Sequence, residues 1–308
     1  MHSEVVIIGS GPAGLAAALY AARARLAPLL LRGEELGGLL ATTGIVENYP
    51  GVPEGLAGFE LSERMELQAE RCGARVVDAV VERVDLSRRP FALATTLGEI
   101  AAEALIVATG AAPRKLGVPG EERLAARGVS YCAICDGPAV GGRRVVVVGG
   151  GDSALGEGLF LARYASEVVF VHRRDRLRAG PALQERARAE PRARFLWDTV
   201  VAEILGDDAV EGVRLWDVRS GAETTLAAGA VFPFIGHRPG TEVFRGQLAL
   251  DRDGYVVTDG RTRTSVPGVF AAGDVADPVY RQAVTAAATG SMAAMEAARF
   301  LAGRDGVR

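Results

Sequence analysis

Two segments of the chain repeat the same order of apolar runs, glycines and small residues. Each has an apolar, mostly β-branched run, a glycine-rich cluster, a stretch rich in alanine or leucine, and a second apolar run. These parts are residues 5–8, 9–14, 15–24 and 29–31 in the first segment, and residues 145–148, 149–154, 155–164 and 168–171 in the second. Each segment therefore predicts a strand–helix–strand unit with a phosphate-binding turn.

One such turn is weak evidence, because glycines also join strands to helices for packing reasons. Two turns in one chain predict two bound nucleotides. Further strands are predicted at residues 105–108, 200–205, 213–216, 231–235 and 269–271, and a final helix at residues 283–301. Turn-rich stretches at 110–117 and 236–240 bracket the second unit. We predict an α/β fold with two Rossmann-like dinucleotide-binding domains, in which residues 114–239 are inserted between residues 1–113 and 240–308.

Composition narrows the class of protein. The chain has 308 residues, of which 49% are hydrophobic and 24% charged, and this length suffices for two domains with their own cores. A formal net charge of -3 creates no general field that would attract nucleic acid or anionic lipid. Residues 5–22 are uncharged, but glycines and Pro12 interrupt them, which argues against a membrane span. The N-terminus shows no export signal, so we expect a cytoplasmic protein.

The first turn consists of Gly9, Ser10, Gly11, Pro12, Ala13 and Gly14. Its glycines allow a tight turn, close approach to a pyrophosphate and close packing of helix on strand, while the helix N-terminus offers N–H groups. The second strand ends at Arg32, where a ribose-binding acid is common, and Glu34 or Glu35 comes slightly late. On this motif alone an NADP site is possible.

Two later motifs resemble the pair found in flavoproteins with two dinucleotide sites. Thr109 and Gly110 follow one predicted strand, and Gly273 and Asp274 follow another. In those proteins the aspartate hydrogen-bonds the ribityl chain of FAD, so the resemblance implies FAD at the first turn. The alternative is that Asp274 caps a helix.

The second turn contains Gly149, Gly151, Asp152 and Ser153, and its second strand leads into a basic group, His172, Arg173, Arg174 and Arg178. An acid at this strand end would suit NAD, whereas arginines can bind a 2'-phosphate in bidentate fashion. Because Lys115 is the only lysine among 35 basic residues, arginine is common throughout the chain. The alternative to a 2'-phosphate site is therefore that these arginines are ordinary solvent-exposed residues at the end of a strand.

Cys132, Cys135 and Asp136 form the remaining group. Two intervening residues let the sulfurs form a disulfide, and the adjacent carboxylate can carry the proton that thiolate release requires. Zinc is the rival explanation, but the other possible ligands, Cys72, His2, His172 and His237, have no metal-site spacing. We predict a redox pair without metal, and a structural role for Cys72.

These motifs together resemble the low-molecular-weight bacterial thioredoxin reductases almost from end to end. The matching blocks are residues 9–14, 46–51, 132–137, 172–175 and the stretch from 273 to 283. The resemblance implies a homodimer that passes electrons from NADPH through FAD to the cysteine pair and then to thioredoxin. Cys135 is expected to face the flavin, Cys132 to attack the substrate, and Asp136 to act as acid and base.

The resemblance also implies the remaining binding residues. Beyond the first turn, those expected at FAD are Gly38, Leu39, Asn48, Val81, Thr109, Gly110, Gly273, Asp274, Arg281, Gln282 and Ala283. Those expected at NADPH are Gly149, Gly151, Asp152, Ser153, His172, Arg173, Arg174 and Arg178. Leu39 replaces the usual glutamine, and Gly156 stands where many members have an acid before Glu157.

Two alternatives stay open. One is a related flavoprotein for another acceptor, either a peroxiredoxin system or a low-molecular-weight disulfide. The other is a non-catalytic nucleotide-binding relative, which the intact Cys-x-x-Cys-Asp sequence disfavours.

Overall fold

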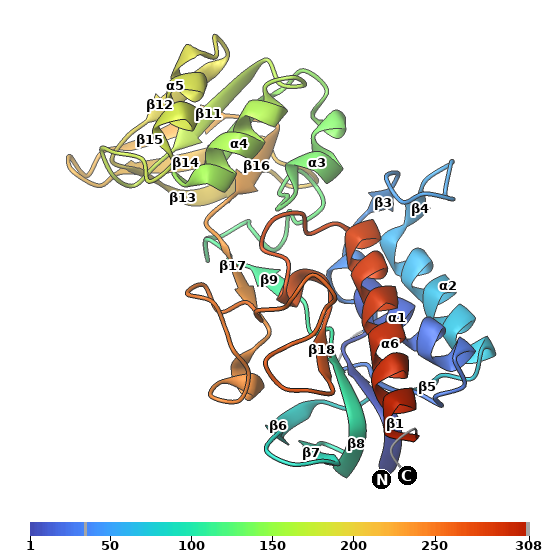
Figure 1. Ribbon diagram of the computed structural model, residues 1–308. Helices are drawn as coiled ribbons and strands as arrows, with labels where there is room; N and C mark the ends of the chain where they lie inside the picture. Colours follow the sequence, from blue (N-terminus) through green and yellow to red (C-terminus); the bar gives the residue numbers. More distant parts are fainter. Residues whose placement is uncertain (34–35, 306–308) are drawn as a thin grey trace. The chain divides into compact units, whose positions relative to one another are not determined.

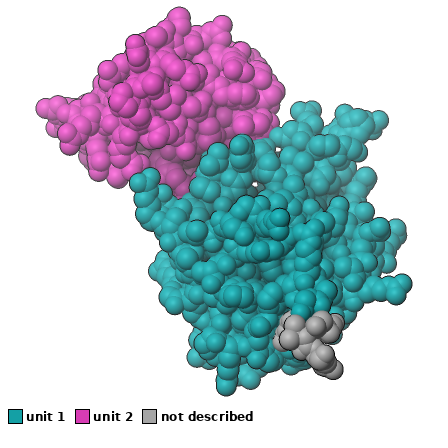
Figure 2. Space-filling view, in the orientation of Figure 1, with its two compact units in different colours: residues 1–112, 238–308 teal, residues 113–237 magenta. Residues whose placement is uncertain are grey.

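The structure is a computed structural model that describes residues 1–33 and 36–303, and the backbone of residues 304 and 305. The chain divides into two compact units (Figure 1, Figure 2). The first unit comprises Met1–Ala112 and Arg238–Arg308, and the second comprises Pro113–His237. The two segments that pass between them, which contain β9 (Ala111–Pro113) and β17 (His237–Pro239), pair with each other.

The first unit is built on a mixed sheet with strand order β5-β2-β1-β8-β7-β6, and β18 also pairs with β8. Its strands are β1 (His2–Ile8), β2 (Leu29–Leu31), β5 (Arg75–Val77), β6 (Val81–Asp85), β7 (Phe91–Thr95), β8 (Gly98–Val107) and β18 (Val269–Ala271). A small hairpin, β3 (Ile45–Val46) with β4 (Leu56–Ala57), lies outside this sheet.

Strand β8 joins the N-terminal and C-terminal parts of the first unit. Along one edge it runs parallel to β1, from His2↔Ala101 to Ile8↔Val107. Along the other edge its first part pairs antiparallel with β7, and residues 105–107 pair parallel with β18. The carboxyl ends of β1, β8 and β18 therefore meet at one edge of the sheet, where ligands bind in folds of this kind.

Helices cover one face of this sheet (Figure 1). They are α1 (Pro12–Arg23), α2 (Gly58–Arg71) and α6 (Ala283–Asp305). Helix α1 begins with proline, whose fixed φ suits the first helical position. Small residues let α1 and α6 pack closely, since a Cβ on Gly290 would lie 2.0 Å from the Ala13 carbonyl oxygen. A second core on the opposite face includes Phe91, Leu105 and Phe244.

The second unit contains a parallel sheet and an antiparallel sheet. The parallel strands, in the order β12-β11-β10-β16, are β10 (Arg144–Val148), β11 (Glu167–Val171), β12 (Ala193–Leu196) and β16 (Ala230–Pro233). The antiparallel strands are β13 (Thr199–Leu205), β14 (Gly212–Asp217) and β15 (Glu223–Ala227). The helices are α3 (Ala133–Asp136), α4 (Asp152–Leu161) and α5 (Pro181–Ala189).

Alternate side chains of β10 point to opposite faces of the parallel sheet, which explains why helices cover one face and the antiparallel sheet covers the other. Val145 and Val147 pack in a core with residues of α4 and α5, whereas Val146 and Val148 pack in a core with residues of the antiparallel sheet. Both faces of the parallel sheet are thus buried, which accounts for its continuous valine run. Short 3-10 helices complete the two units: η1 (Gly38–Leu40), η2 (Pro138–Val140), η3 (Glu242–Phe244) and η4 (Gly273–Val275). In the described part of the chain no helix has the length and apolar character needed to span a membrane.

Several predicted bounds need correction. Helix α1 begins at Pro12 rather than residue 15, because the end of the glycine turn forms its first turn. Helix α4 covers Asp152–Leu161 instead of residues 155–164. Strand β8 begins at Gly98 and not at residue 105, because its first part pairs with β7.

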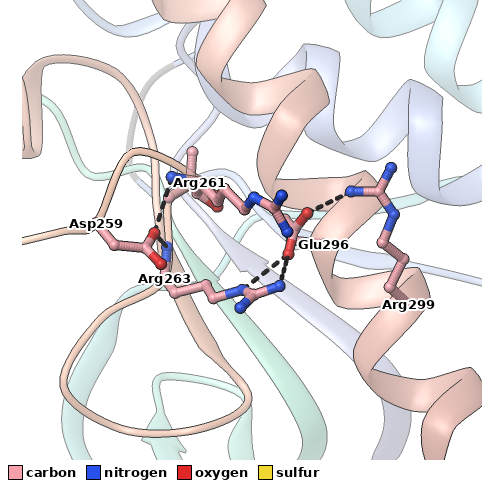
Figure 3. Close-up of polar contacts among 6 residues, drawn as sticks. Asp259, Arg261, Arg263, Glu296 and Arg299 are labelled. Atoms are coloured by element: carbon pink, nitrogen blue, oxygen red, sulfur yellow. Dashed lines mark hydrogen bonds and ion pairs between the residues drawn. The ribbon is translucent and has the colours of Figure 1, made fainter.

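An ion-pair cluster fixes α6 to the segment before β18 (Figure 3). Glu296 is 4% exposed and accepts hydrogen bonds from Arg263 Nε at 2.8 Å and from the Arg299 guanidinium. Asp259 in turn accepts the backbone N–H groups of Arg261 and Arg263 at 2.8 and 3.0 Å. The carboxylate of Glu296 thus orders the segment that leads into β18.

We expect Glu296→Gln to destabilise the protein by about 1 kcal/mol, since charge-assisted hydrogen bonds are lost but both guanidinium groups are at least half exposed. Urea unfolding at neutral pH measures the effect, with the exposed Glu63→Gln as control. The hydrogen bond from Arg263 holds the pKa of Glu296 below its ordinary value. The advantage of the wild type should therefore disappear as acid protonates Glu296, below about pH 4. A pH-independent difference would contradict this account.

Candidate functional site

The first glycine turn leaves an open face for a ligand. Gly9 has φ +107, and a Cβ there would lie 2.3 Å from the Ala108 carbonyl oxygen, so β1 and β8 approach closely. Above Gly11 the nearest atom to an added Cβ is the Gly37 carbonyl oxygen at 3.9 Å. This open face at the N-terminus of α1 fits the pyrophosphate of a dinucleotide.

Residues 37–39 border the first turn. The Gly37 N–H donates to Ser10 Oγ at 3.2 Å, and Ser10 Oγ donates to the Arg32 carbonyl oxygen at 3.1 Å. A Cβ on Gly38 would lie 3.7 Å from Gly11 Cα, so Gly38 lies beside the turn. The Leu39 side chain is 48% exposed.

The other two strand ends also reach this place. The Thr109 hydroxyl donates to the Gly240 carbonyl oxygen at 2.7 Å, and the Gly273 N–H donates to Thr289 Oγ1 at 2.9 Å. A Cβ on Gly273 would lie 2.7 Å from Ala13 Cβ. Thr109 Cα would lie 3.3 Å from a Cβ on Gly9, so Thr109 and Gly273 border the first turn.

Asp274 is the acidic group of this site. Burial, and next the charge of Asp277, raise its pKa to about 6, while Arg281 lowers it. The carboxylate accepts no hydrogen bond from another residue in the described part of the chain, so it caps no helix there. Its oxygens are available to accept from the hydroxyl groups of a ligand.

Two expected flavin contacts that lie far apart in sequence meet in the structure. Asn48 Nδ2 donates to Gln282 Oε1 at 3.4 Å, and Gln282 is followed by Ala283 at the start of α6. Val81, by contrast, begins the edge strand β6 and packs in the second core, two strands away from β8. Glu34 and Glu35 lie outside the described residues.

The second turn has the same open face. A Cβ on Gly151 would have as its nearest neighbour Arg178 Nη2 at 3.9 Å. The adjacent Gly150 packs against the His172 ring, whose Cε1 would lie 2.4 Å from an added Cβ. Ser153 is exposed in the first turn of α4, and Asp152 Oδ1 accepts the Gly180 N–H at 2.8 Å. This turn also fits a pyrophosphate, with a guanidinium beside it.

Arg173, Arg174 and Arg178 make the end of β11 positive. His172 is 8% exposed and its Nε2 lies 3.0 Å from the Arg176 carbonyl oxygen, so its ring supports the turn. Burial lowers the pKa of His172, and the charges of Arg174, Arg178 and Arg173 lower it further. None of these three arginines forms an ion pair with a carboxylate of the described chain.

The cysteine pair lies at the start of α3 as a Cys132–Cys135 disulfide. The Cys135 N–H donates to Cys132 Sγ at 3.1 Å, a contact that favours a thiolate at Cys132 once the pair is reduced. Cys132 is half-buried and Cys135 is exposed. The exposed apolar side chain of Ile134 lies between them in the sequence.

Two groups next to the disulfide were not recognised from the sequence. The buried Ser130 hydroxyl donates to Asp136 Oδ2 and accepts the Cys132 N–H at 3.1 Å. Glu157 Oε2 accepts the Ala133 N–H at 3.3 Å. The position of Ser130 two residues before Cys132 is the only signal in the sequence, since a hydroxyl there can bond the backbone two residues on.

The loop before the disulfide is anchored by a buried carboxylate. Glu121 is 1% exposed and accepts the Tyr131 hydroxyl at 2.8 Å. It also accepts the Leu116 and Gly117 N–H groups at 2.9 and 2.7 Å. Burial, followed by this hydrogen bond, raises the pKa of Tyr131, so its hydroxyl stays protonated and holds the loop in place.

The described residues include no group of three or more His, Cys, Asp or Glu side chains placed to hold a metal ion. Cys72 is a free thiol that follows α2 and packs against the first core.

Comparison with known proteins identifies the class. Residues 3–290 match the family model of the pyridine nucleotide-disulphide oxidoreductases, so the chain belongs to that family. Within it, the chain belongs to the thioredoxin reductases. It is 49% identical to the thioredoxin reductase of Rickettsia prowazekii, with 97% of this chain and 98% of the relative covered. It is 50% identical to that of Streptomyces coelicolor, with 97% and 94% covered.

Solved structures agree with this assignment. The thioredoxin reductase from Giardia duodenalis superimposes with a TM-score of 0.93 at 42% identity, over 98% of this chain and 99% of that one. The thioredoxin reductase from Streptococcus pyogenes gives the same TM-score and coverage at 40% identity. The predicted family and fold class are thereby confirmed.

Proposed function

We propose that the protein is an NADPH-dependent thioredoxin-disulfide reductase in which electrons pass from NADPH through FAD and the Cys132–Cys135 pair to thioredoxin. The observation that carries the proposal is an accessible disulfide beside the Ser130–Asp136 hydrogen bond, in the same unit as a glycine turn whose neighbouring arginines form no ion pair with a carboxylate of the described residues. The thioredoxin reductases named above support the choice of acceptor.

We assign FAD to the domain formed by residues 1–113 and 240–308. The open face above Gly11, the buried carboxylate of Asp274 and the Asn48–Gln282 contact support this assignment. NADPH is assigned to the domain of residues 114–239, where Gly151 is open and Arg173, Arg174 and Arg178 can meet a 2'-phosphate. When bound, the two coenzymes supply the electron pair that reduces the disulfide.

The remaining chemistry belongs to the cysteine pair. The Cys132 thiolate attacks one sulfur of the substrate disulfide, which forms a mixed disulfide and releases one substrate thiolate. Cys135 then attacks Cys132 Sγ, which restores the Cys132–Cys135 bond and releases the second thiolate. Asp136 transfers protons to and from sulfur, and the Ser130 hydroxyl orients its carboxylate. One disulfide is reduced and one is formed, so the electrons balance.

We also propose a homodimer that works in the cytoplasm. Exposed apolar side chains on α6, including Val284, Met292 and Met295, together with Tyr20 on α1, provide a surface on the first unit that a second copy could cover.

Replacing Cys135 by serine should separate the two half-reactions. We expect NADPH still to bleach the flavin, whereas thioredoxin reduction is abolished, because only the second half-reaction requires both sulfurs. Anaerobic stopped-flow absorbance and a steady-state thioredoxin assay measure the two steps. Cys72→Ser is the control and should keep both activities. Sustained turnover by Cys135→Ser would refute the relay, and a panel of other disulfides tests the alternative acceptors.

Arg173 and Arg174 should determine coenzyme preference. Each hydrogen bond to a charged group contributes about 1.5 to 3 kcal/mol, so Arg173→Ala with Arg174→Ala should raise KM for NADPH roughly tenfold or more. KM for NADH should change little, since NADH has no 2'-phosphate. The exposed Arg186→Ala serves as control, and equal effects on both coenzymes would exclude the assignment.

FAD affinity should fall in acid because of Asp274. Burial raises the pKa of this carboxyl group to about 6 in the free protein. A ribityl hydroxyl that donates to the carboxylate favours the ionised form, so FAD binding lowers this pKa and releases a proton at acid pH. Affinity should fall up to about tenfold per pH unit below about pH 6, and Asp274→Asn should bind FAD weakly without this dependence. Fluorescence titration of the flavin-free protein measures both, and a flat wild-type profile would contradict the assignment.

A further inference from the structure

Both dinucleotide turns have an arginine within three residues of the end of the second strand. Arg32 follows β2, and Arg173 with Arg174 follows β11 and His172. In dinucleotide-binding folds the side chain at this place lies beside the adenosine ribose, where an acid accepts the 2'-hydroxyl and an arginine accommodates a 2'-phosphate. By residue type alone, both turns would therefore select a 2'-phosphate. FAD, the coenzyme proposed for the first turn, has none.

The surroundings of Arg32 differ from those of the other arginines. Arg32 Nε donates to Asp78 Oδ1 at 2.6 Å, and Arg32 Nη1 donates to Glu66 Oε1 at 2.9 Å. Glu66 belongs to α2 with a side chain 14% exposed, and Asp78 directly follows β5 with a side chain 72% exposed. Two carboxylates thus hold one guanidinium, and the cluster carries a net negative charge.

The basic group of the second turn lacks such partners among the described residues. Arg173, Arg174 and Arg178 have no carboxylate ion pair there, and Arg178 Nη2 borders the open face of Gly151. Their combined charge is felt by His172, whose pKa it lowers in addition to the effect of burial. The two turns therefore present opposite net charge with the same type of residue.

We propose that Glu66 and Asp78 are specificity-determining residues, which neutralise and hold Arg32 so that the first turn takes an adenosine ribose without a 2'-phosphate. A 2'-phosphate at this place would meet the negative charge of the cluster, and two of the three Arg32 nitrogens, Nε and Nη1, already donate to carboxylates. An unmodified ribose carries no charge and is tolerated. The inference rests on the proposed function, in which the first turn holds FAD.

Competition with FAD tests the inference. The flavin is removed from the full-length protein, and FAD rebinding is followed by flavin fluorescence in the presence of NAD⁺ or NADP⁺, which differ only in the 2'-phosphate. Displacement of FAD reports the first turn whatever binds at the second. In the wild type NAD⁺ should displace FAD at lower concentration than NADP⁺. In Asp78→Asn and in Glu66→Gln the ratio of the two inhibition constants should shift toward NADP⁺ by about tenfold, the equivalent of one hydrogen bond to a charged group.

Matched variants distinguish a change in coenzyme selectivity from a general destabilisation of the binding site. Glu63→Gln removes an exposed carboxylate from the same helix that forms no ion pair with Arg32 among the described residues, and should leave the ratio unchanged. Adding Arg32→Gln to Asp78→Asn should restore the wild-type ratio, because no cation is left to bind the phosphate. Asp78 is largely exposed, so Asp78→Asn carries the test if Glu66→Gln fails to fold.

Two outcomes would overturn the inference while FAD still binds. One is an unchanged ratio in Asp78→Asn, and the other is a shift that persists without Arg32. If the wild-type protein takes up no FAD, the proposed function fails instead.

Discussion

The close contact between the first glycine turn and the C-terminal helix is the constraint on which the first unit depends. A Cβ on Gly290 would lie 2.0 Å from the Ala13 carbonyl oxygen, so α6 packs on α1 only because a side chain is missing there. The first unit is therefore complete only when α6, near the C-terminus, packs on α1, near the N-terminus. The second unit is inserted in the sequence between β8 and β18, two strands that pair with each other in the first unit. The chain therefore leaves the first unit after β8 and re-enters it before β18, and the two connecting segments pair through β9 and β17.

Local sequence patterns predicted the parts that are governed by local physics. The valine run of β10 and the leucine run of β2 are strands because both faces of their sheets are buried, and no partner needs to be known to recognise them. The first part of β8 was missed because its residues alternate in burial, and their strand conformation depends on the hairpin partner β7. The glycine turns and the cysteine pair were recognisable because each motif carries its chemistry within a few residues.

The parts that the sequence could not predict rest on contacts between distant residues. Asn48 and Gln282 lie 234 positions apart, and only the resemblance to a family pointed to both. Beyond the position of Ser130 two residues before Cys132, the sequence gives no sign of its role, because a serine in a loop acquires a specific meaning only when its hydroxyl joins Asp136 to the Cys132 backbone. The carboxylate of Glu157 accepts the N–H of Ala133, a residue 24 positions earlier that no local pattern connects to Glu157.

Arginine shows most clearly why residue type alone is insufficient. In a chain where Lys115 is the only lysine, an arginine at a strand end says little, and Arg32 taken alone permits an NADP site. Its charge is offset by Glu66 and Asp78, which come from α2 and from the end of β5, elements that no pattern connects to the turn. The same residue type after β11 has no such partner among the described residues, so its charge remains available to a ligand. The coenzyme that a turn can accept thus depends on the net charge of the assembled cluster, and that quantity exists only once α2 and β5 have packed beside β2.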